Sequence, residues 1–539
     1  MLDRELAQLA KSLPIQNRFA DTLPGDHSGD HSSREVLGAC YSDAIPRPAK
    51  APKLVVYAAE VAQLLGLPAQ QCESEAFSHV FSGRTLLPDM QPYAMCYGGH
   101  QFGHWAGQLG DGRAINLGEV SAADTLWSLQ LKGAGRTPYS RHADGLAVLR
   151  SSVREFLCSE AMHHLGVSTT RALSLVLTGE SVTRDMFYDG HPQREPGAVV
   201  CRVAKSFVRF GSFEIFAHRG EQALLKQLAD YTITEHYPQL MDGEIGCDTY
   251  VRWFTEIVER TARLMADWMR VGFVHGVMNT DNLSIIGDTI DYGPYGWLEG
   301  YDPNWTPNTT DAEGRRYCYG AQPNIGLWNL VRLANAIYPL VGEAKPLEDA
   351  LERYSEVFAD TRSADMAAKL GLAQYRDEDG HLIEDLLTLL QQTETDMTLF
   401  FRRLSQIDVP LLATGVDWAS LSPLHDAYYV DVPSAVRQQT CEWITRYLRR
   451  TQESLSLAGE SERDRKARMD SVNPKYVLRN YLAQVAIEQA EQGDYSEVNR
   501  LLNCLRNPYD DQPEFDCYAA KRPEWARVKP GCSMLSCSS

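Results

Sequence analysis

The chain has 539 residues, of which 44% are hydrophobic and 23% are charged, proportions that are typical of globular proteins. A chain of this length corresponds to about three to four domains and can bury large cores without disulfide or metal staples. Its formal net charge of −19 opposes contact with nucleic acid phosphates and anionic membrane surfaces, so we expect neither nucleic acid nor membrane as a partner.

The N-terminal part shows little regular patterning. The segment MLDRELAQLAKSLPIQ has early acidic residues and no continuous apolar stretch, so it matches neither a secretory signal nor a transit peptide. No run of 18 apolar residues occurs, and the cytoplasmic compartment is therefore expected. Residues 1–50 are expected to be irregular, with the helix-breaking segments GDHSGDHSS and PRPAKAPK, whereas the apolar spacing at 54–67 predicts a helix that ends near Gly66.

The next part is rich in glycine and then in β-forming segments. The segment TLWSLQLKGAG predicts a strand with Trp127, Leu129 and Leu131 on one face and Lys132 on the other. The pattern over 146–166 predicts a helix. Further strands are predicted at 171–178, 181–187 and 198–208.

The remainder of the chain is predominantly helical. Residues 249–273 have apolar side chains at helical spacing, and helices are predicted through most of 323–505. The fold class is therefore α+β, with a smaller mixed lobe followed by a larger helical lobe. We predict four units: an N-terminal extension (1–92), the mixed lobe (93–214), the helical lobe (215–505) and a C-terminal tail (506–539).

A glycine-rich turn, GQLGDGR, is the first candidate for nucleotide binding. Gly110 and Gly112 would let backbone N–H groups approach a phosphate, but the turn of a β-hairpin accounts for the same residues. The chain contains neither GxxxxGK[ST] nor a strand–GxGxxG–helix unit, so P-loop and Rossmann sites are not supported.

A lysine and a glutamate follow in the order found in protein kinases. Lys132 ends the predicted strand and Glu155 lies in the next predicted helix, an arrangement that places an ammonium on nucleotide phosphates. A surface lysine is the alternative. Two windows are locally basic: 130–155 has five basic and two acidic residues, and 199–211 has three basic residues and no acid. Such windows favour a polyphosphate ligand or form a solvated surface.

The segment HGVMNTDN followed by IDYG matches part of the kinase catalytic pattern HRDxxxxN…DFG. Asn282 follows His275 by seven residues, and Asp291 begins the DYG triplet. In kinases such residues hold Mg²⁺ on the phosphates. Val277 replaces the kinase catalytic aspartate, but Asp281 lies beside Asn282. Ordinary turns explain each segment alone, whereas the kinase order of all the motifs together favours a nucleotide site.

The twelve cysteines are scattered and contain no CxxC pair, which opposes a disulfide scaffold and a structural zinc site. Cys532 and Cys537 lie in the polar tail GCSMLSCSS, where accessible thiols are expected. An ordinary tail and a redox pair both remain open.

These motifs resemble the selenoprotein O family of protein adenylyltransferases, long regarded as pseudokinases. The resemblance spans nearly the whole chain, through YGGHQFGHWAGQLGDGRA, LQLKGAGRTPYSRHADGLAVLRSSVREFLCSEAM, HGVMNTDN, IDYGPYGW, NPKYVLRNYLAQ and the cysteine-containing tail. It implies a protein-kinase-like two-lobed fold that binds ATP in a reversed orientation. It also implies transfer of AMP to Ser, Thr or Tyr hydroxyls of protein substrates.

The resemblance implies roles for individual residues. Asp281 matches the proposed proton acceptor, Asn282 and Asp291 match metal ligands, and Glu155 matches the partner of the family lysine. The positions implied to contact the nucleotide are Gly110, Gly112, Arg113, Lys132, Asp144, Gly145, Arg202, Arg209 and Asp291. Cys537 stands at the place of selenocysteine in animal members, where a regulatory disulfide is implied.

Several alternatives remain open at this stage. The disulfide partner of Cys537 could be Cys532 or Cys318. ATP is the expected substrate with Mg²⁺ as the metal, while UMP transfer from UTP and use of Mn²⁺ are alternatives. The other hypotheses are an atypical protein kinase and an inactive nucleotide-binding pseudokinase scaffold. The sequence does not define the acceptor proteins or the oligomeric state, and a monomer is compatible with it.

Overall fold

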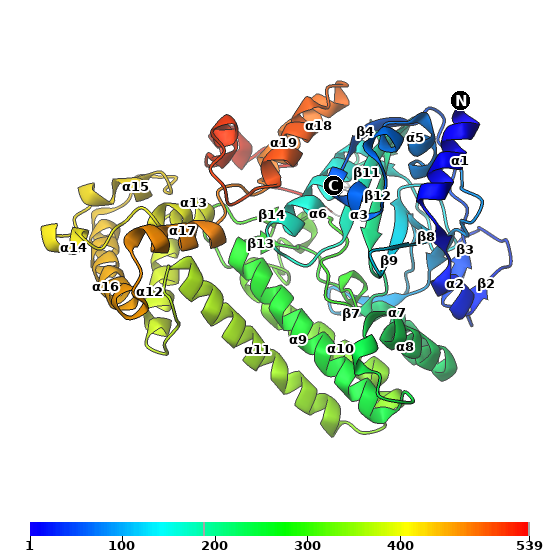
Figure 1. Ribbon diagram of the computed structural model, residues 1–539, viewed down its shortest axis with the longest axis horizontal. Coiled ribbons are helices and arrows are strands. Elements are labelled where there is room, and N and C mark those ends of the chain that lie inside the picture. The colour runs from blue at the N-terminus through cyan, green and yellow to red at the C-terminus, as the bar shows by residue number, and fades with distance from the viewer. Residues whose placement is uncertain (187–188, 537–539) are drawn as a thin grey trace.

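The structure is a computed structural model that describes residues 1–186 and 189–536 (Figure 1). Its fold is α+β, as predicted: strands dominate the N-terminal part and helices the C-terminal part. Within the described ranges, no helix is both long enough and apolar enough to cross a membrane.

A ten-stranded mixed sheet forms in the described N-terminal part. Its strands are β1 (Ile15–Gln16), β2 (Gly25–Asp26), β3 (Tyr41–Asp43), β4 (Lys53–Tyr57), β5 (Tyr93–Met95), β8 (Ala114–Ala122), β9 (Thr125–Lys132), β10 (Ala147–Val148), β11 (Arg171–Arg184) and β12 (Gln193–Ala204). The order is β2-β3-β5-β8-β9-β12-β11-β4, with β1 on β8 and β10 on β12. The pair β2–β3 is parallel, whereas the long central pairs are antiparallel.

The second half of strand β9, from Ser128 to Lys132, is buried on both faces. Leu129 and Leu131 are fully buried, as the predicted apolar face requires. Gln130 and Lys132, on the opposite face, are also buried, because arginine side chains and helix α6 (Leu149–His164) pack over that side. A buried polar face at the centre of a sheet indicates a site rather than a simple core.

Two predicted elements differ in the structure. The helix predicted at 54–67 is wrong in its first half, because the β-branched run there pairs with β11 as strand β4 and only α3 (Ala59–Leu64) is helical. The two strands predicted at 171–178 and 181–187 are separate in the prediction, but the structure has one continuous strand, β11, over Arg171–Arg184. A register shift lies at its middle, where Gly179 has a φ of +76°.

The predicted helix after β9 is α6, which packs on β11 and β12. The other helices are α1 (Leu2–Ser12), α2 (Arg18–Thr22), α4 (Ala69–Cys72), α5 (Glu75–Phe81), α7 (Phe210–Arg219), α8 (Gln222–His236), α9 (Cys247–Val271), α10 (Gln322–Val341), α11 (Lys345–Lys369), α12 (Asp379–Gln392), α13 (Met397–Leu404), α14 (Leu411–Thr414), α15 (Ser422–His425), α16 (Ser434–Ala458), α17 (Glu462–Val472), α18 (Asn480–Glu491) and α19 (Ser496–Leu505). Helices α9, α10 and α11 lie side by side, and α18 and α19 return to pack on α6 (Figure 1).

Two short β pairs lie outside the sheet and position the site. The hairpin β6 (Gly98–Gln101) and β7 (His104–Gln108) packs against α7. Strands β13 (Phe273–Val274) and β14 (Gly296–Trp297) flank the segment with the kinase-like motifs. The main hydrophobic core joins the sheet to the nearer helices, and α12, α13, α16 and α17 share a second cluster farther away.

Candidate active site

One cavity of about 750 Å³ gathers nearly all the residues that the sequence singled out. Its volume is within the range of small-ligand sites. Glu155 lies behind the cavity wall, and Cys537 lies outside the described residues. The predicted residues that line the cavity are Gly110, Gly112, Arg113, Lys132, Asp144, Gly145, Arg202, Arg209, Asp281, Asn282 and Asp291.

A continuous chain of ion pairs forms the inner wall of this cavity. The ammonium of Lys132 lies 2.5 Å from the carboxylate of Glu155 in α6. Glu155 also lies 3.2 Å from the guanidinium of Arg202 in β12, which in turn lies 2.7 Å from Asp291. Arg209 pairs with the other carboxylate oxygen of Asp291. Both arginines are only 2% exposed, so they are fixed cations at the buried end.

Lys132 is therefore not a surface lysine. Burial lowers the pKa of the Lys132 ammonium, and Glu155 pulls that pKa upward. Burial alone would raise the pKa of Glu155, but the charges of Lys132 and Arg202 outweigh burial and leave this pKa below its ordinary value. Glu155 thus remains ionised behind the cations.

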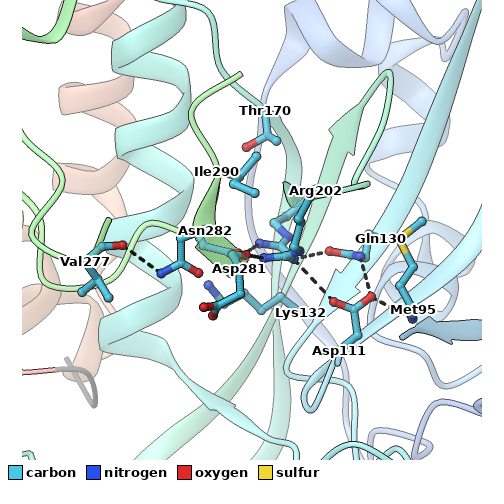
Figure 2. Close-up of polar contacts among 12 residues, drawn as sticks. Met95, Asp111, Gln130, Lys132, Thr170, Arg202, Val277, Asp281, Asn282 and Ile290 are labelled. Carbon is cyan, nitrogen blue, oxygen red and sulfur yellow. Dashed lines mark hydrogen bonds and ion pairs between the residues drawn. The ribbon is translucent and has the colours of Figure 1, made fainter. Parts of the chain in front are cut away.

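Asp111 anchors one of these arginines and was missed by the sequence reasoning. It lies between Gly110 and Gly112, and its carboxylate is 3.5 Å from the guanidinium of Arg209. The same carboxylate accepts hydrogen bonds from the amide nitrogen of Met95 and the side chain of Gln130 (Figure 2). Burial raises the pKa of Asp111, while Arg209 lowers it. The glycine segment thus supplies a buried carboxylate as well as flexible backbone.

The glycines of this segment are required by close packing. A Cβ atom on Gly110, which has a φ of +69°, would lie 2.2 Å from the ring of Tyr139. One on Gly112 would lie 2.9 Å from the Tyr139 carbonyl oxygen, and one on Gly145 would lie 2.1 Å from the carbonyl oxygen of Gly135. Strands β7 and β8 do not pair with each other, so the hairpin-turn interpretation is wrong.

Asp281 brings a largely buried carboxylate to the cavity. It lies in a single helical turn, Thr280–Asn282, and is 7% exposed. Its Oδ2 accepts a hydrogen bond of 3.2 Å from Gln101, whereas its Oδ1 is buried and has no hydrogen-bond partner among the described residues. Burial raises the pKa of Asp281 to about 6, against the hydrogen bond from Gln101. A hydroxyl group in the cavity could donate to this carboxylate.

The hairpin β6–β7 holds the loop of Asp281 in place. The amide of His100 donates to the Thr280 hydroxyl at 2.7 Å, and the amide of Phe102 donates to the side chain of Asn279 at 3.2 Å. A Cβ atom on Gly99 would lie only 2.8 Å from the Asp281 carboxylate. Sequence reasoning missed Gln101 and this hairpin, and the glycine pair in GGHQFG was the one available signal.

The residues implied to bind Mg²⁺ have suitable donor atoms. The side-chain nitrogen of Asn282 donates to the Val277 carbonyl at 2.9 Å, which leaves its oxygen for another partner (Figure 2). Asp291, at a φ of +59°, presents a carboxylate to the same cavity. No three His, Cys, Asp or Glu side chains in the described part of the chain could hold a metal alone. The set therefore fits Mg²⁺ that completes its shell with substrate oxygens and water.

The two basic windows reach the cavity only in part. Arg150 pairs with Glu195 at 2.9 Å, and Arg154 packs 4.2 Å from the ring centre of Tyr295, so neither lines the cavity. Lys205 lines a different pocket. At the exposed rim, Asp144 pairs with Arg184 at 2.7 Å.

Two cysteines that the sequence singled out, Cys318 and Cys532, are buried free thiols in the structure. Cys532 is 6% exposed, and burial raises its pKa to about 11, so the expectation of an accessible thiol is wrong there. Cys318 is also buried, and the cysteines of the described ranges are all free thiols. Cys537 lies outside the described residues.

Comparisons with a family model and with individual proteins both point to the same family. The model of the family described as protein adenylyltransferase SelO matches residues 29–506. A protein nucleotidyltransferase YdiU from Aromatoleum aromaticum is 55% identical, over 98% of this chain and all of its own length. Proteins of that name from Rhodopirellula baltica and Xanthomonas axonopodis pv. citri are each 57% identical, over 98% of this chain and 99% of their own lengths.

Proposed function

The chain belongs to the SelO family of protein adenylyltransferases and is a nucleotidyltransferase, and we propose that the cavity described above is its active site. The proposed reaction transfers AMP from ATP to Ser, Thr or Tyr hydroxyls of acceptor proteins and releases pyrophosphate.

The position of Arg202 and Arg209 is the observation that carries the proposal. Arg202 lies in β12 and Arg209 directly precedes α7, at the buried end of the cavity. A purine base there would be desolvated against two guanidinium groups, whereas phosphate oxygens match their charge and geometry. We therefore infer that the triphosphate lies inward and the base lies near Asp144 and Gly145, which is the reverse of ordinary kinases.

The chain's own groups account for the transfer step. Lys132, Arg202 and Arg209 neutralise the phosphates and the charge that develops as the acceptor oxygen attacks the α-phosphorus. Asp281 orients the acceptor hydroxyl through its carboxylate and takes its proton, while pyrophosphate leaves in line. Mg²⁺ held by Asn282 and Asp291 would add further neutralisation of the phosphates when bound.

We further propose that the fold is protein-kinase-like. The ion pair between Lys132 and Glu155 supports this assignment, because kinases join a strand lysine to a helix glutamate in the same way. Asn282 and Asp291 follow in kinase order. Val277, at the position of the kinase base, is apolar and 8% exposed, which disfavours ordinary transfer of the γ-phosphate.

Labelled ATP tests the reaction directly. We expect label from the α-phosphate, and none from the γ-phosphate, to be retained on acceptor protein in the presence of Mg²⁺. The variant Asp281→Asn should lose at least about 100-fold in rate, as expected for removal of a general base, while still binding nucleotide. Retention of the γ-label alone would show an ordinary kinase, and equal labelling by Asp281→Asn would remove Asp281 from the reaction.

A further inference from the structure

A second cationic surface lies beside the cavity and has no role in the nucleotide site. It consists of Arg315, Arg316, Trp328 and Arg332, which we call the Arg–Trp surface. The guanidinium carbons of Arg316 and Arg332 lie 4.7 and 5.0 Å from the ring centre of Trp328. Trp328 and Arg332 are four residues apart on α10 and so share a helix face.

The arginines of this surface form no close ion pairs among the described residues, although the charge of Arg316 acts on the nearby Asp311 carboxylate. In the part of the chain that the structure describes, none of them forms an ion pair within 4.0 Å, whereas the arginines of the nucleotide site do. The Nε atoms of Arg316 and Arg332 are buried without a hydrogen-bond partner among the described residues. The nearby carboxylate of Asp311 is occupied by the backbone amides of Arg316 and Tyr317, at 3.0 and 2.7 Å. Unpaired cations are unexpected in a chain of net charge −19.

The surface is continuous with the catalytic loop. The Cα position of Gly103 is so close to Arg316 that an added Cβ atom would lie 3.4 Å from the guanidinium carbon. Gly103 lies two residues beyond Gln101, whose side chain holds Asp281. Between them, Phe102 has a φ of +50°, a strained value for a bulky residue, and its ring lies 5.2 Å from that of Tyr317. The Arg–Trp surface therefore lies next to the hairpin that contacts Asp281.

We propose that the Arg–Trp surface binds carboxylate side chains of an acidic segment that flanks the acceptor hydroxyl. This inference rests on the proposed function and specifies its class of protein substrate. Guanidinium groups bind carboxylates through two parallel hydrogen bonds, and stacking on Trp328 holds Arg316 and Arg332 in place before binding. Their missing partners are then the glutamates or aspartates of the acceptor.

Paired acceptor peptides provide the test. Two sets of synthetic peptides place Ser, Thr or Tyr between flanking glutamates or between flanking lysines, and a third set has neutral flanks. We expect wild type to label the acidic set with a kcat/KM about tenfold or more above the neutral set, the gain of one charged hydrogen bond or more. The double variant Arg316→Ala/Arg332→Ala should lose this preference and keep its KM for ATP. Arg316→Lys/Arg332→Lys should retain part of it.

A control variant shows whether the loss of peptide preference is specific to this surface or follows from removing any arginine that packs on a tryptophan. Arg437 in α16 packs 5.5 Å from the ring centre of Trp418, far from the cavity, so Arg437→Ala should keep the peptide preference. Melting temperatures identify variants that do not fold. If the wild-type enzyme labels neither the peptides nor itself, the proposed function is contradicted.

Three other outcomes overturn the inference alone. These are equal or greater labelling of the lysine-flanked set, an unchanged preference in the double alanine variant, and a raised KM for ATP in that variant.

Discussion

Gln101 shows how one side chain can control the proposed proton acceptor. Its amide donates to Oδ2 of Asp281 and so holds the carboxylate in one orientation at the cavity. Gln101→Leu should lower kcat about tenfold with an unchanged KM for ATP, because a hydrogen bond to a charged group contributes about 1.5–3 kcal/mol. Gln101→Glu should be worse, since it places a second carboxylate beside the first. Steady-state kinetics that show wild-type kcat for Gln101→Leu would contradict this positioning role.

The buried ion pair between Lys132 and Glu155 leads to a second prediction at the residue scale, which concerns the stability of the folded chain. Removing one partner of a buried pair leaves an uncompensated charge and costs about 3–5 kcal/mol. Glu155→Gln should therefore melt well below wild type. Adding Lys132→Met removes the stranded ammonium, while Arg202 keeps its contact with Asp291. The double variant should thus melt above the single variant Glu155→Gln, and a melting temperature below it would show that the two charges do not depend on each other.

At the scale of elements, Gly107 in strand β7 and Gly110 just after that strand permit a matched comparison. Gly107 and Gly110 both have positive φ, at +73° and +69°, but a Cβ atom on Gly107 meets nothing within 4 Å. Gly107→Ala should therefore cost only the backbone term of about 1–2 kcal/mol. Gly110→Ala must also displace the Tyr139 ring and should cost about 1–3 kcal/mol more, with weaker ATP binding because Asp111 moves. Thermal melting measures the difference, and equal melting temperatures would contradict the packing argument.

Elements whose apolar residues recur at a regular spacing were predictable from the sequence, and elements without such a spacing were not. Helices α6 and α9 follow from apolar spacing over many residues. The sequence LVVYAAEVAQLL places a strand directly before a helix without a break, so the boundary before α3 was predicted wrongly. The hairpin β6–β7 has too many glycines for an alternating pattern, and nothing local shows that it packs on the loop of Asp281.

For the molecule as a whole, the order of motifs was informative and the contacts between them were not. The kinase-like order correctly brought Lys132, Asn282 and Asp291 to one cavity. Gln101 could not be found in this way, because its partner Asp281 lies 180 residues later and the pairing exists only after folding. The same holds for Arg316, whose approach to Gly103 joins distant segments.

Global stability should depend on pH through Glu119, a buried carboxyl group far from the proposed chemistry. Burial raises its pKa to about 7, although the amide of Arg18 and the hydroxyl of Tyr93 donate hydrogen bonds to it. In the unfolded chain its pKa is about 4.3. Between these values the folded state binds more protons, so stability must fall as pH rises from about 4 to 7, by an amount of order 3 kcal/mol.

Replacing Glu119 with its neutral isostere should remove this dependence. In Glu119→Gln the side-chain oxygen can still accept from Arg18, and the new amide can donate to the Tyr93 hydroxyl. The melting temperature of the variant relative to wild type should therefore rise between pH 5 and pH 7. Glu384→Gln, at a side chain that is 80% exposed, should show no such trend. A constant difference between Glu119→Gln and wild type across this range would mean that Glu119 has the same pKa in the folded and unfolded chain.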